Sequence, residues 1–127
     1  MKILVLDDDP FRHKKFKSWF IGHDVIHAYN FSQFKAALLR NNFDYIFLDH
    51  DLNDHQAISV DTGEGRELTG LDATKLLVSM NMQRQVKQVI VHSFNPDGAK
   101  AMMKLLNDNG FNALRWVFDP RAELKVN

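Results

Sequence analysis

Residues 45–52, Tyr-Ile-Phe-Leu-Asp-His-Asp-Leu, decide how the rest of the sequence is interpreted. Four apolar residues of aromatic and branched types are followed at once by three ionisable ones, Asp49, His50 and Asp51. Burying these three side chains unpaired would be too costly, so they must reach solvent, a metal ion or a ligand. The stretch therefore predicts a buried strand with a functional site at its carboxyl end.

Two other apolar runs end in the same way. Ile3–Leu6 is followed by three aspartates, and Val89–Val91 is followed by His92 and Ser93. Buried strands with polar residues only at their carboxyl ends are typical of doubly wound α/β sheets, which bind ligands outside that edge. We therefore predict a flavodoxin-like, three-layer α/β fold with a five-stranded parallel sheet in the order 2-1-3-4-5.

Strands and helices alternate along the whole chain, as parallel strands joined by crossover helices require. Asp9-Pro10 and Asn95-Pro96 each place a capping residue before a proline, which is a strong signal for a helix start. The predicted strands cover residues 2–6, 25–29, 43–48, 86–91 and 111–118. The predicted helices cover residues 10–20, 31 to about 40, 70 to about 80, and 96–109.

The fifth predicted strand is followed by only nine residues, Asp119 to Asn127. These are too few for an ordinary final helix, so we expect the last helix to be missing or reduced to a turn. A face left open in this way would present apolar surface, on which we expect a possible homo-oligomer contact.

Composition places the chain among globular proteins. Its 127 residues are enough for one domain with a hydrophobic core, and we interpret residues 1–127 as a single domain. The 16 basic and 16 acidic residues give a net charge of zero, which argues against non-specific DNA binding. The absence of cysteine excludes disulfides and thiolate chemistry. Neither a signal-peptide pattern nor an apolar run of ~20 residues is present, so we expect a cytoplasmic protein without a membrane contact.

The predicted strand order brings Asp7 and Asp8 beside Asp49 and Asp51, although the pairs lie far apart in sequence. Carboxylates gathered in one cleft repel one another, and a divalent cation is the usual solution. Oxygen ligands suit Mg²⁺, Mn²⁺ or Ca²⁺, whereas an additional histidine ligand would favour Mn²⁺, Fe or Zn²⁺. We expect these four aspartates to be metal ligands and Mg²⁺ or Mn²⁺ to be the cofactor.

The other polar residues at this edge suit phosphate chemistry. The helix that begins after Asn95 presents free N–H groups, which favour phosphate. Ser93 is better placed for a phosphate hydrogen bond than for nucleophilic attack, because no base is evident beside it. Asp49, His50 and His92 are the catalytic candidates, although alternation along a strand points His50 away from the aspartates that flank it.

Two segments beside the site have alternative interpretations. The polar segment Asn53–Glu67 exceeds the ~12–15 residues usual for loops, which favours a lid or a substrate-contacting loop over a floppy insertion. The first helix has a basic side, interpreted as a solvated face with a phosphate- or partner-binding patch as the alternative. That side carries Arg12, His13, Lys14, Lys15 and Lys17.

Taken together, these residues resemble the receiver domains of two-component response regulators. The resemblance rests on Leu4–Pro10 and Phe47–Asp49 and extends over nearly the whole chain except the last helix. It implies Mg²⁺ binding at Asp7 and Asp8, and a phosphoacceptor position at Asp49. It also implies that Ser93 takes the place of a conserved Thr or Ser, and Trp116 that of a switch aromatic.

Several features depart from that pattern. The Lys-Pro that receivers carry after the fifth strand is Asp119-Pro120 here, which reverses the charge that would balance a phosphoryl group. Three blocks in order resemble instead the cyclic-phosphate-processing receiver family, a divergent branch of the receiver fold. They are Leu-Asp-His-Asp-Leu at 48–52, Thr-Gly-Leu-Asp at 69–72, and His-Ser-Phe-Asn-Pro at 92–96 with Gly98 and Met102 beyond it.

This second resemblance implies action on the cyclic phosphates of nucleotides or RNA ends. A metal ion held by Asp7, Asp8 and Asp49 would polarise a phosphodiester and activate water. His50 or His92 would act as acid or base, and Ser93 and Asn95 would hold the phosphate oxygens. A cyclic phosphate needs no acceptor lysine, consistent with the aspartate at 119.

Three functions are therefore considered. The first is a metal-dependent phosphoesterase, or at least a binder, of cyclic phosphates. The second is a stand-alone phosphorelay receiver phosphorylated on Asp49, against which the missing lysine and final helix argue. The third is a degenerate receiver used for protein–protein contact, against which the retained acidic cluster argues.

Overall fold

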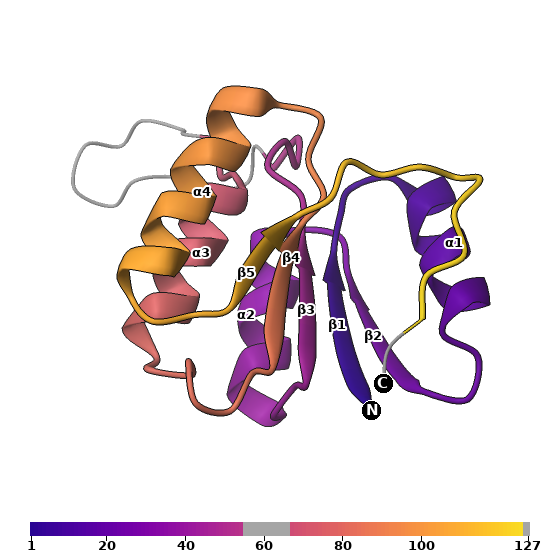
Figure 1. Cartoon of the computed structure of the whole chain (residues 1–127), viewed down its shortest axis with the longest axis horizontal. Coiled ribbons are helices and arrows are strands. Elements are labelled where there is room, and N and C mark those ends of the chain that lie inside the picture. The colour runs from indigo at the N-terminus through magenta and orange to yellow at the C-terminus, as the bar shows by residue number, and fades with distance from the viewer. Residues whose placement is uncertain (55–66, 126–127) are drawn as a thin grey trace.

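The computed structural model describes residues 1–54 and 67–125 of the chain. Its centre is a five-stranded, fully parallel sheet in the order β2-β1-β3-β4-β5, as predicted (Figure 1). The strands are β1 (Lys2–Leu6), β2 (Asp24–Ala28), β3 (Tyr45–Leu48), β4 (Gln88–Val91) and β5 (Ala113–Arg115).

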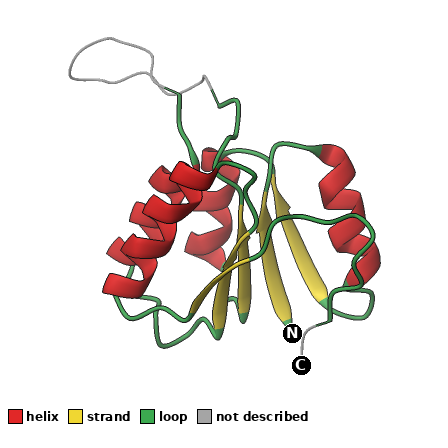
Figure 2. Ribbon diagram, turned by 45° about the horizontal axis from the view of Figure 1, so that its top comes forward, coloured by secondary structure: helices red, strands yellow, loops and turns green. Residues whose placement is uncertain are grey.

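Helices cover both faces of the sheet. They are α1 (Pro10–Trp19), α2 (Phe31–Arg40), α3 (Gly70–Ser79) and α4 (Pro96–Asp108). Helix α1 lies on one face, and α2, α3 and α4 pack on the other, which makes the predicted three layers (Figure 2). In the described part of the chain, no helix is long and apolar enough to cross a bilayer.

Each helix begins at a capping side chain. Asp9, which precedes Pro10, accepts a hydrogen bond from the Phe11 amide through its carboxylate. Asn95, which precedes Pro96, accepts one from the Gly98 amide. Thr69 and Asp72 form a reciprocal capping box at α3. Such caps satisfy N–H groups that a helix cannot pair internally, so these residues determine where the chain turns from the sheet edge into a helix.

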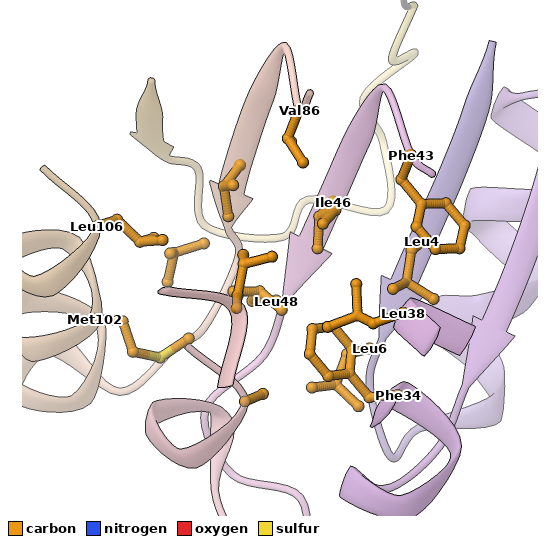
Figure 3. Close-up of a cluster of buried hydrophobic side chains, with 14 of the residues drawn as sticks. Leu4, Leu6, Phe34, Leu38, Phe43, Ile46, Leu48, Val86, Met102 and Leu106 are labelled. Atoms are coloured by element: carbon orange, nitrogen blue, oxygen red, sulfur yellow. The ribbon is translucent and has the colours of Figure 1, made fainter. Parts of the chain in front are cut away.

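The sheet separates two hydrophobic cores. The larger core lies under α2, α3 and α4 and contains Leu4, Leu6, Phe34, Ile46 and Leu48, all with no exposed surface (Figure 3). The smaller core lies under α1 and is built from aromatic rings. Burial on both faces explains why β1, β3 and β4 are continuous apolar runs, so that polar chemistry is confined to the strand ends.

The described residues after β5 form a segment that packs on the α1 side of the sheet. Among the described residues after β5 there is no helix, in agreement with the expectation from sequence. Instead, Trp116, Phe118 and Leu124 pack against the core under α1, and Figure 1 shows the yellow segment running across to that helix. The prediction of a fifth strand over 111–118 was too long. Trp116 still donates its amide to the Val91 carbonyl at 2.9 Å, and the chain then leaves the sheet.

Candidate metal and phosphate site

The carboxyl ends of β1 and β3 lie side by side, because the two strands pair with Leu6 opposite Leu48. The Asp49 amide donates to the Leu6 carbonyl at 3.0 Å. One carboxylate oxygen from each of Asp7, Asp8 and Asp49 lies within 4.8 Å of the other two. Three of the four aspartates predicted as metal ligands therefore meet at this edge, and we call them the acidic cluster.

The guanidinium of Arg12 lies among these carboxylates. Its Nε donates to Asp7 Oδ2 at 2.6 Å and its Nη2 to Asp7 Oδ1 at 2.8 Å, which is a bidentate pair. Nη2 also lies 3.3 Å from Asp49 Oδ2 and 3.5 Å from Asp8 Oδ1. The expectation of a solvated face is wrong for Arg12. A residue in the first turn of a helix directs its side chain back over the helix start, which here leads to the strand ends.

His92 supports the acidic cluster from within the core. Its Nε2 lies 2.8 Å from Asp7 Oδ2, and the residue is only 1% exposed. Its ring contacts Phe16 and Phe47, with ring centroids 5.2 and 6.4 Å away. Nδ1 is buried and has no hydrogen-bond partner among the described residues. The structure thus places this catalytic candidate behind Asp7, where it orients the carboxylate.

The pKa values of Asp7 and Asp49 are shifted in opposite directions although both residues are buried. Burial raises the pKa of Asp7, but hydrogen bonds from His92 and Arg12 outweigh burial and hold that pKa well below its usual range. Burial and the charge of Asp7 raise the pKa of Asp49 to about 6. Burial and the same charge also raise the pKa of Asp8. The acidic cluster therefore carries unrelieved negative charge despite the presence of Arg12.

His50 lies beside the acidic cluster at the start of α4. Its Nδ1 is 2.8 Å from Asp51 Oδ1 and 3.4 Å from Asn95 Nδ2. A Cβ on Gly98 would lie 2.5 Å from the ring, so the imidazole occupies the space that this glycine leaves open. Asp51 is exposed and is not a member of the acidic cluster; its carboxylate is engaged with His50.

A second glycine anchors α3 to the end of β3. The Gly70 amide donates to the His50 carbonyl at 2.7 Å. A Cβ on Gly70 would collide with the Asp49 carbonyl, so only glycine allows this approach of the two backbones. Gly70 and Gly98 therefore fix the chain on either side of Asp49 and His50.

Ser93 and Asn95 make local hydrogen bonds in this structure. The Ser93 hydroxyl, on a 1% exposed residue, accepts from the Asn95 amide at 3.0 Å. The Asn95 Oδ1 accepts from the Gly98 amide at 3.0 Å as the α4 cap. Asn95 Nδ2 remains at the surface of the site, 3.4 Å from Asp51 Oδ1. The proposed phosphate donors therefore also shape the helix start.

The residues 53 and 54 connect the polar segment after β3 to the site. The Asn53 Nδ2 donates to Asp8 Oδ2 at 3.1 Å. The Leu68 amide donates to the Asp54 carbonyl at 2.9 Å, so the two ends of the segment meet. Most of the predicted lid Asn53–Glu67 lies outside the described residues, and the expectation that it covers a ligand stays a prediction.

A buried histidine pair next to Asp7 was not predicted. His13 is 2% exposed, and its Nε2 lies 2.6 Å from the Asp7 carbonyl oxygen. Its Nδ1 is 2.7 Å from His27 Nδ1, and its ring lies 4.0 Å from that of Tyr29. Burial lowers the pKa of both histidines. The signal was the spacing: His13 has the same helical phase as Phe16 and Phe20, which face the core.

The donors present fit a divalent cation. Three carboxylates supply hard oxygen ligands within a small space, and a guanidinium nitrogen already stands among them as a cationic group. Such oxygen-rich sites suit Mg²⁺ or Mn²⁺. Asp7, Asp8 and Asp49 are the residues that would hold the ion.

The fold described above is the fold of response-regulator receiver domains. The receiver domain protein from Methanospirillum hungatei has a TM-score of 0.63 at 15% identity, over 94% of this chain and 84% of that one. The signal receiver domain from Clostridium thermocellum has a TM-score of 0.63 at 16% identity, over 96% and 87%. NtrX from Brucella abortus has a TM-score of 0.65 at 17% identity, but this chain covers only 24% of it. At these identities the likeness shows the fold.

The sequence itself defines the branch. The profile of the family described as cyclic-phosphate processing receiver domain matches residues 2–108. The chain belongs to that family, as its three sequence blocks predicted. No curated protein sequence matches it.

Proposed function

We propose that this receiver domain binds a divalent metal ion at the acidic cluster and binds or hydrolyses cyclic phosphates of nucleotides or RNA ends. The observation that carries the proposal is the convergence of Asp7, Asp8 and Asp49, whose carboxylate oxygens lie within 4.8 Å of one another. Membership of a family described as processing cyclic phosphates supports the choice of ligand.

When bound, the metal ion supplies a Lewis acid for the phosphate and lowers the pKa of water. The chain supplies the rest. Asp7 is held ionised by His92 and Arg12, so it is ready to bind a cation near neutral pH. Asp49, with a pKa of about 6, is largely ionised at the same pH. Cation binding would offset the repulsion between the three carboxylates.

His50 is the residue best placed to exchange a proton with a bound phosphate. It lies at the rim of the site with 16% of its side chain exposed, whereas His92 is enclosed. Asp51 engages Nδ1, so proton exchange with a ligand would use Nε2. Acid–base catalysis requires such reach to the reacting oxygen, and for this reason we assign the role to His50 and a supporting role to His92.

The start of α4 is the proposed phosphate contact. The N-terminus of the helix and the Asn95 Nδ2 lie at the edge that holds His50 and Asp51. Because Pro96 has no N–H and the Gly98 amide donates to Asn95 Oδ1, the first turn offers the Asp97 amide to a phosphate. Helix N-termini favour anions, and Nδ2 adds a neutral donor. The Ser93 hydroxyl accepts a hydrogen bond from the Asn95 amide, so Ser93 contributes to phosphate binding by positioning the start of α4.

The proposal is tested by turnover of 2′,3′-cyclic nucleotides with Mg²⁺ and with Mn²⁺, for the wild type and Asp49→Asn. We expect metal-dependent turnover that Asp49→Asn reduces by at least about a hundredfold, because the loss of a residue that only supports a metal ligand already costs about 10–100-fold. Asp108→Asn is the matched control: it removes an exposed carboxylate at the last residue of α4, at the opposite end of that helix from the site. Absence of both turnover and binding with either metal would contradict the proposal.

A second candidate function is phosphorelay through phosphorylation of Asp49. The solved structures with this fold are response-regulator receivers, which favours it. Against it, Asp119 stands where a receiver has lysine, and its carboxylate accepts from Arg121 rather than reaching the site. Incubation with a small phosphodonor and Mg²⁺ distinguishes the two: a stable acyl phosphate on Asp49 would favour phosphorelay.

A further inference from the structure

One nitrogen atom, Arg12 Nη2, touches all three members of the acidic cluster. It lies 2.8 Å from Asp7 Oδ1, 3.3 Å from Asp49 Oδ2 and 3.5 Å from Asp8 Oδ1. These are the carboxylates whose oxygens gather within 4.8 Å of one another. A positively charged group in hydrogen-bond or ion-pair range of three carboxylates stands where a cation bound to them would stand.

Arg12 and a divalent ion exclude each other at this position. An ion bound to carboxylates sits about 2.0–2.6 Å from their oxygens, closer than the guanidinium nitrogen does. It would take the lone pairs that now accept from Nη2 and Nε. Like charges at such a distance also repel. An ion can therefore enter only if the guanidinium leaves.

Two groups at the rim of the site can bind the guanidinium after it is displaced. Nη1 lies 3.3 Å from Asp9 Oδ2, on a side chain that is 38% exposed. The Arg12 Cζ lies 5.8 Å from the centroid of the Phe94 ring, which is 57% exposed and precedes α4. A cation over an aromatic face is favourable even at exposed sites. These two contacts can keep the displaced group near the start of α4, where the phosphate is proposed to bind.

We propose that Arg12 is a built-in competitor for the metal position, and that on metal binding its guanidinium moves to the rim and becomes a phosphate-binding group. The inference rests on the proposed function for its phosphate. It explains how a strongly acidic cluster persists without an ion, and it supplies a cation on the phosphate side of the site. Metal and phosphate binding are then coupled through one side chain.

The first test is a calorimetric titration of Mn²⁺ into the wild type, Arg12→Gln and Lys14→Gln. If Arg12 competes, Arg12→Gln binds Mn²⁺ about tenfold or more tightly than the wild type, one decade being about 1.4 kcal/mol. Lys14→Gln, which removes the same charge two residues further along α1 on an exposed side chain, leaves the affinity within about twofold. If Arg12 instead holds the ligands in place, its loss weakens Mn²⁺ binding, and that result overturns the proposal.

The second test uses the wild type alone, because removal of Arg12 leaves Asp7 short of partners and could prevent folding. The Nε–H signal of Arg12 in a ¹⁵N-labelled sample reports its hydrogen bond to Asp7. Saturating Mg²⁺ should shift that signal to the position of a free guanidinium. Metal binding that leaves the signal unchanged overturns the displacement.

The phosphate role has its own measurement. Inorganic phosphate is titrated into the Mn²⁺-saturated wild type, Arg12→Lys and Arg12→Gln. We expect the wild type to bind most tightly, Arg12→Lys more weakly because it lacks the bidentate fork, and Arg12→Gln at least about tenfold more weakly than the wild type. Equal phosphate binding by the three proteins overturns the rim role. The metal-only titration and cyclic-nucleotide turnover by the wild type would still stand, so the failures are distinguishable.

Discussion

At the scale of single residues, Asp7 and Asp49 show that identical side chains at one sheet edge have opposite energetic roles. Asp7 has no exposed surface but is surrounded by donors from Arg12 and His92. Asp49 is 5% exposed, and burial and the charge of Asp7 oppose its ionisation. Without a metal ion, ionised Asp7 stabilises the fold and ionised Asp49 opposes it.

The two aspartates should therefore respond with opposite sign to the same substitution in metal-free protein. Asp7→Asn breaks a buried bidentate pair and is expected to lower the free energy of unfolding by about 3 kcal/mol or more. Asp49→Asn removes a strained charge and is expected to raise it by about 1–3 kcal/mol at pH 7.5. Urea unfolding of the three proteins in chelator measures both changes. Two destabilising substitutions would contradict this account.

The pH dependence follows from the same pKa shifts. The pKa of Asp49 is about 6 in the folded protein against 3.8 ordinarily. Because Asp49 holds its proton more tightly in the folded protein, protonated Asp49 stabilises the fold. This stabilisation is fully present below about pH 3.8 and is lost as pH rises through 6. The advantage of Asp49→Asn should therefore be present at pH 7.5 and vanish by about pH 4. An advantage that does not change between these pH values would show that the pKa of Asp49 is not raised.

Gly98 is expected to control the position of His50. Gly98→Ala places a methyl group 2.5 Å from the imidazole, and the displacement is expected to cost about 1–3 kcal/mol of stability and to shift the ring resonances of His50. Ala101→Gly is the control, because Ala101 is exposed on the same helix and its change should cost about 1 kcal/mol with no effect on His50. Thermal unfolding and NMR spectra provide the two readouts, and an unshifted His50 in Gly98→Ala would be the contrary result.

The sequence predicted site residues correctly where the end of a strand determines the position of the side chain. Asp7, Asp8 and Asp49 were predicted to meet because β1 and β3 pair, and they do. The position of Arg12 was not predicted, because helical phase places the Cα of a residue but not the end of a long side chain. The burial of His13 was predictable in principle from its spacing to Phe16. It was instead assigned to the solvated face because it was grouped with the basic residues of the same helix.

At the scale of elements, the start of α4 serves both the fold and the site. Asn95 caps the helix through Oδ1 and presents Nδ2 toward His50 and Asp51. Asn95→Asp keeps a good cap and replaces the donor by a negative charge. We expect the unfolding free energy to change by less than about 0.5 kcal/mol, while binding of 2′,3′-cyclic nucleotide weakens at least about tenfold.

Asn95→Ala is the complementary variant, expected to lose about 1 kcal/mol of stability through loss of the cap. Calorimetry and urea unfolding of both variants separate the two roles of Asn95. Unchanged nucleotide binding in Asn95→Asp would remove this residue from the proposed phosphate site.

Element boundaries were predicted best where caps and prolines mark them. Pro10 and Pro96 begin α1 and α4 as expected. The end of β5 was misplaced because Trp116 and Phe118 are strand formers by composition, and the contacts that decide their place come from α1. The long segment after β3 lacks any periodic pattern, so its sequence predicted only its length.

At the scale of the whole molecule, the segment after β5 covers part of the sheet face on which α1 lies. Phe118 is 6% exposed and lies 5.7 Å, ring to ring, from Phe16 and 5.4 Å from Trp19. Phe118→Ala is expected to lower the free energy of unfolding by about 3 kcal/mol. Val117→Ala, at a 45% exposed position next to it, should change it by less than about 0.5 kcal/mol. Equal effects in thermal unfolding would show that the segment does not pack as described.

Part of that face stays open. A groove of about 280 Å³ between the segment and the sheet is lined by Tyr45, Ile90, Leu114 and Trp116, among others. The homo-oligomer expected from the sequence would use this surface and stays a prediction. Sedimentation velocity over a hundredfold range of concentration tests it: a constant monomer mass would contradict it.

The central claim is that a metal ion at the acidic cluster binds the phosphate of a cyclic nucleotide. The most direct measurement is calorimetric binding of 2′,3′-cyclic nucleotide to the wild type with Mn²⁺, with chelator, and to Asp49→Asn with Mn²⁺. The account predicts binding by the wild type with Mn²⁺ and at least about tenfold weaker binding in the other two cases. Equal binding with and without the metal, or no binding in any of them, would contradict it.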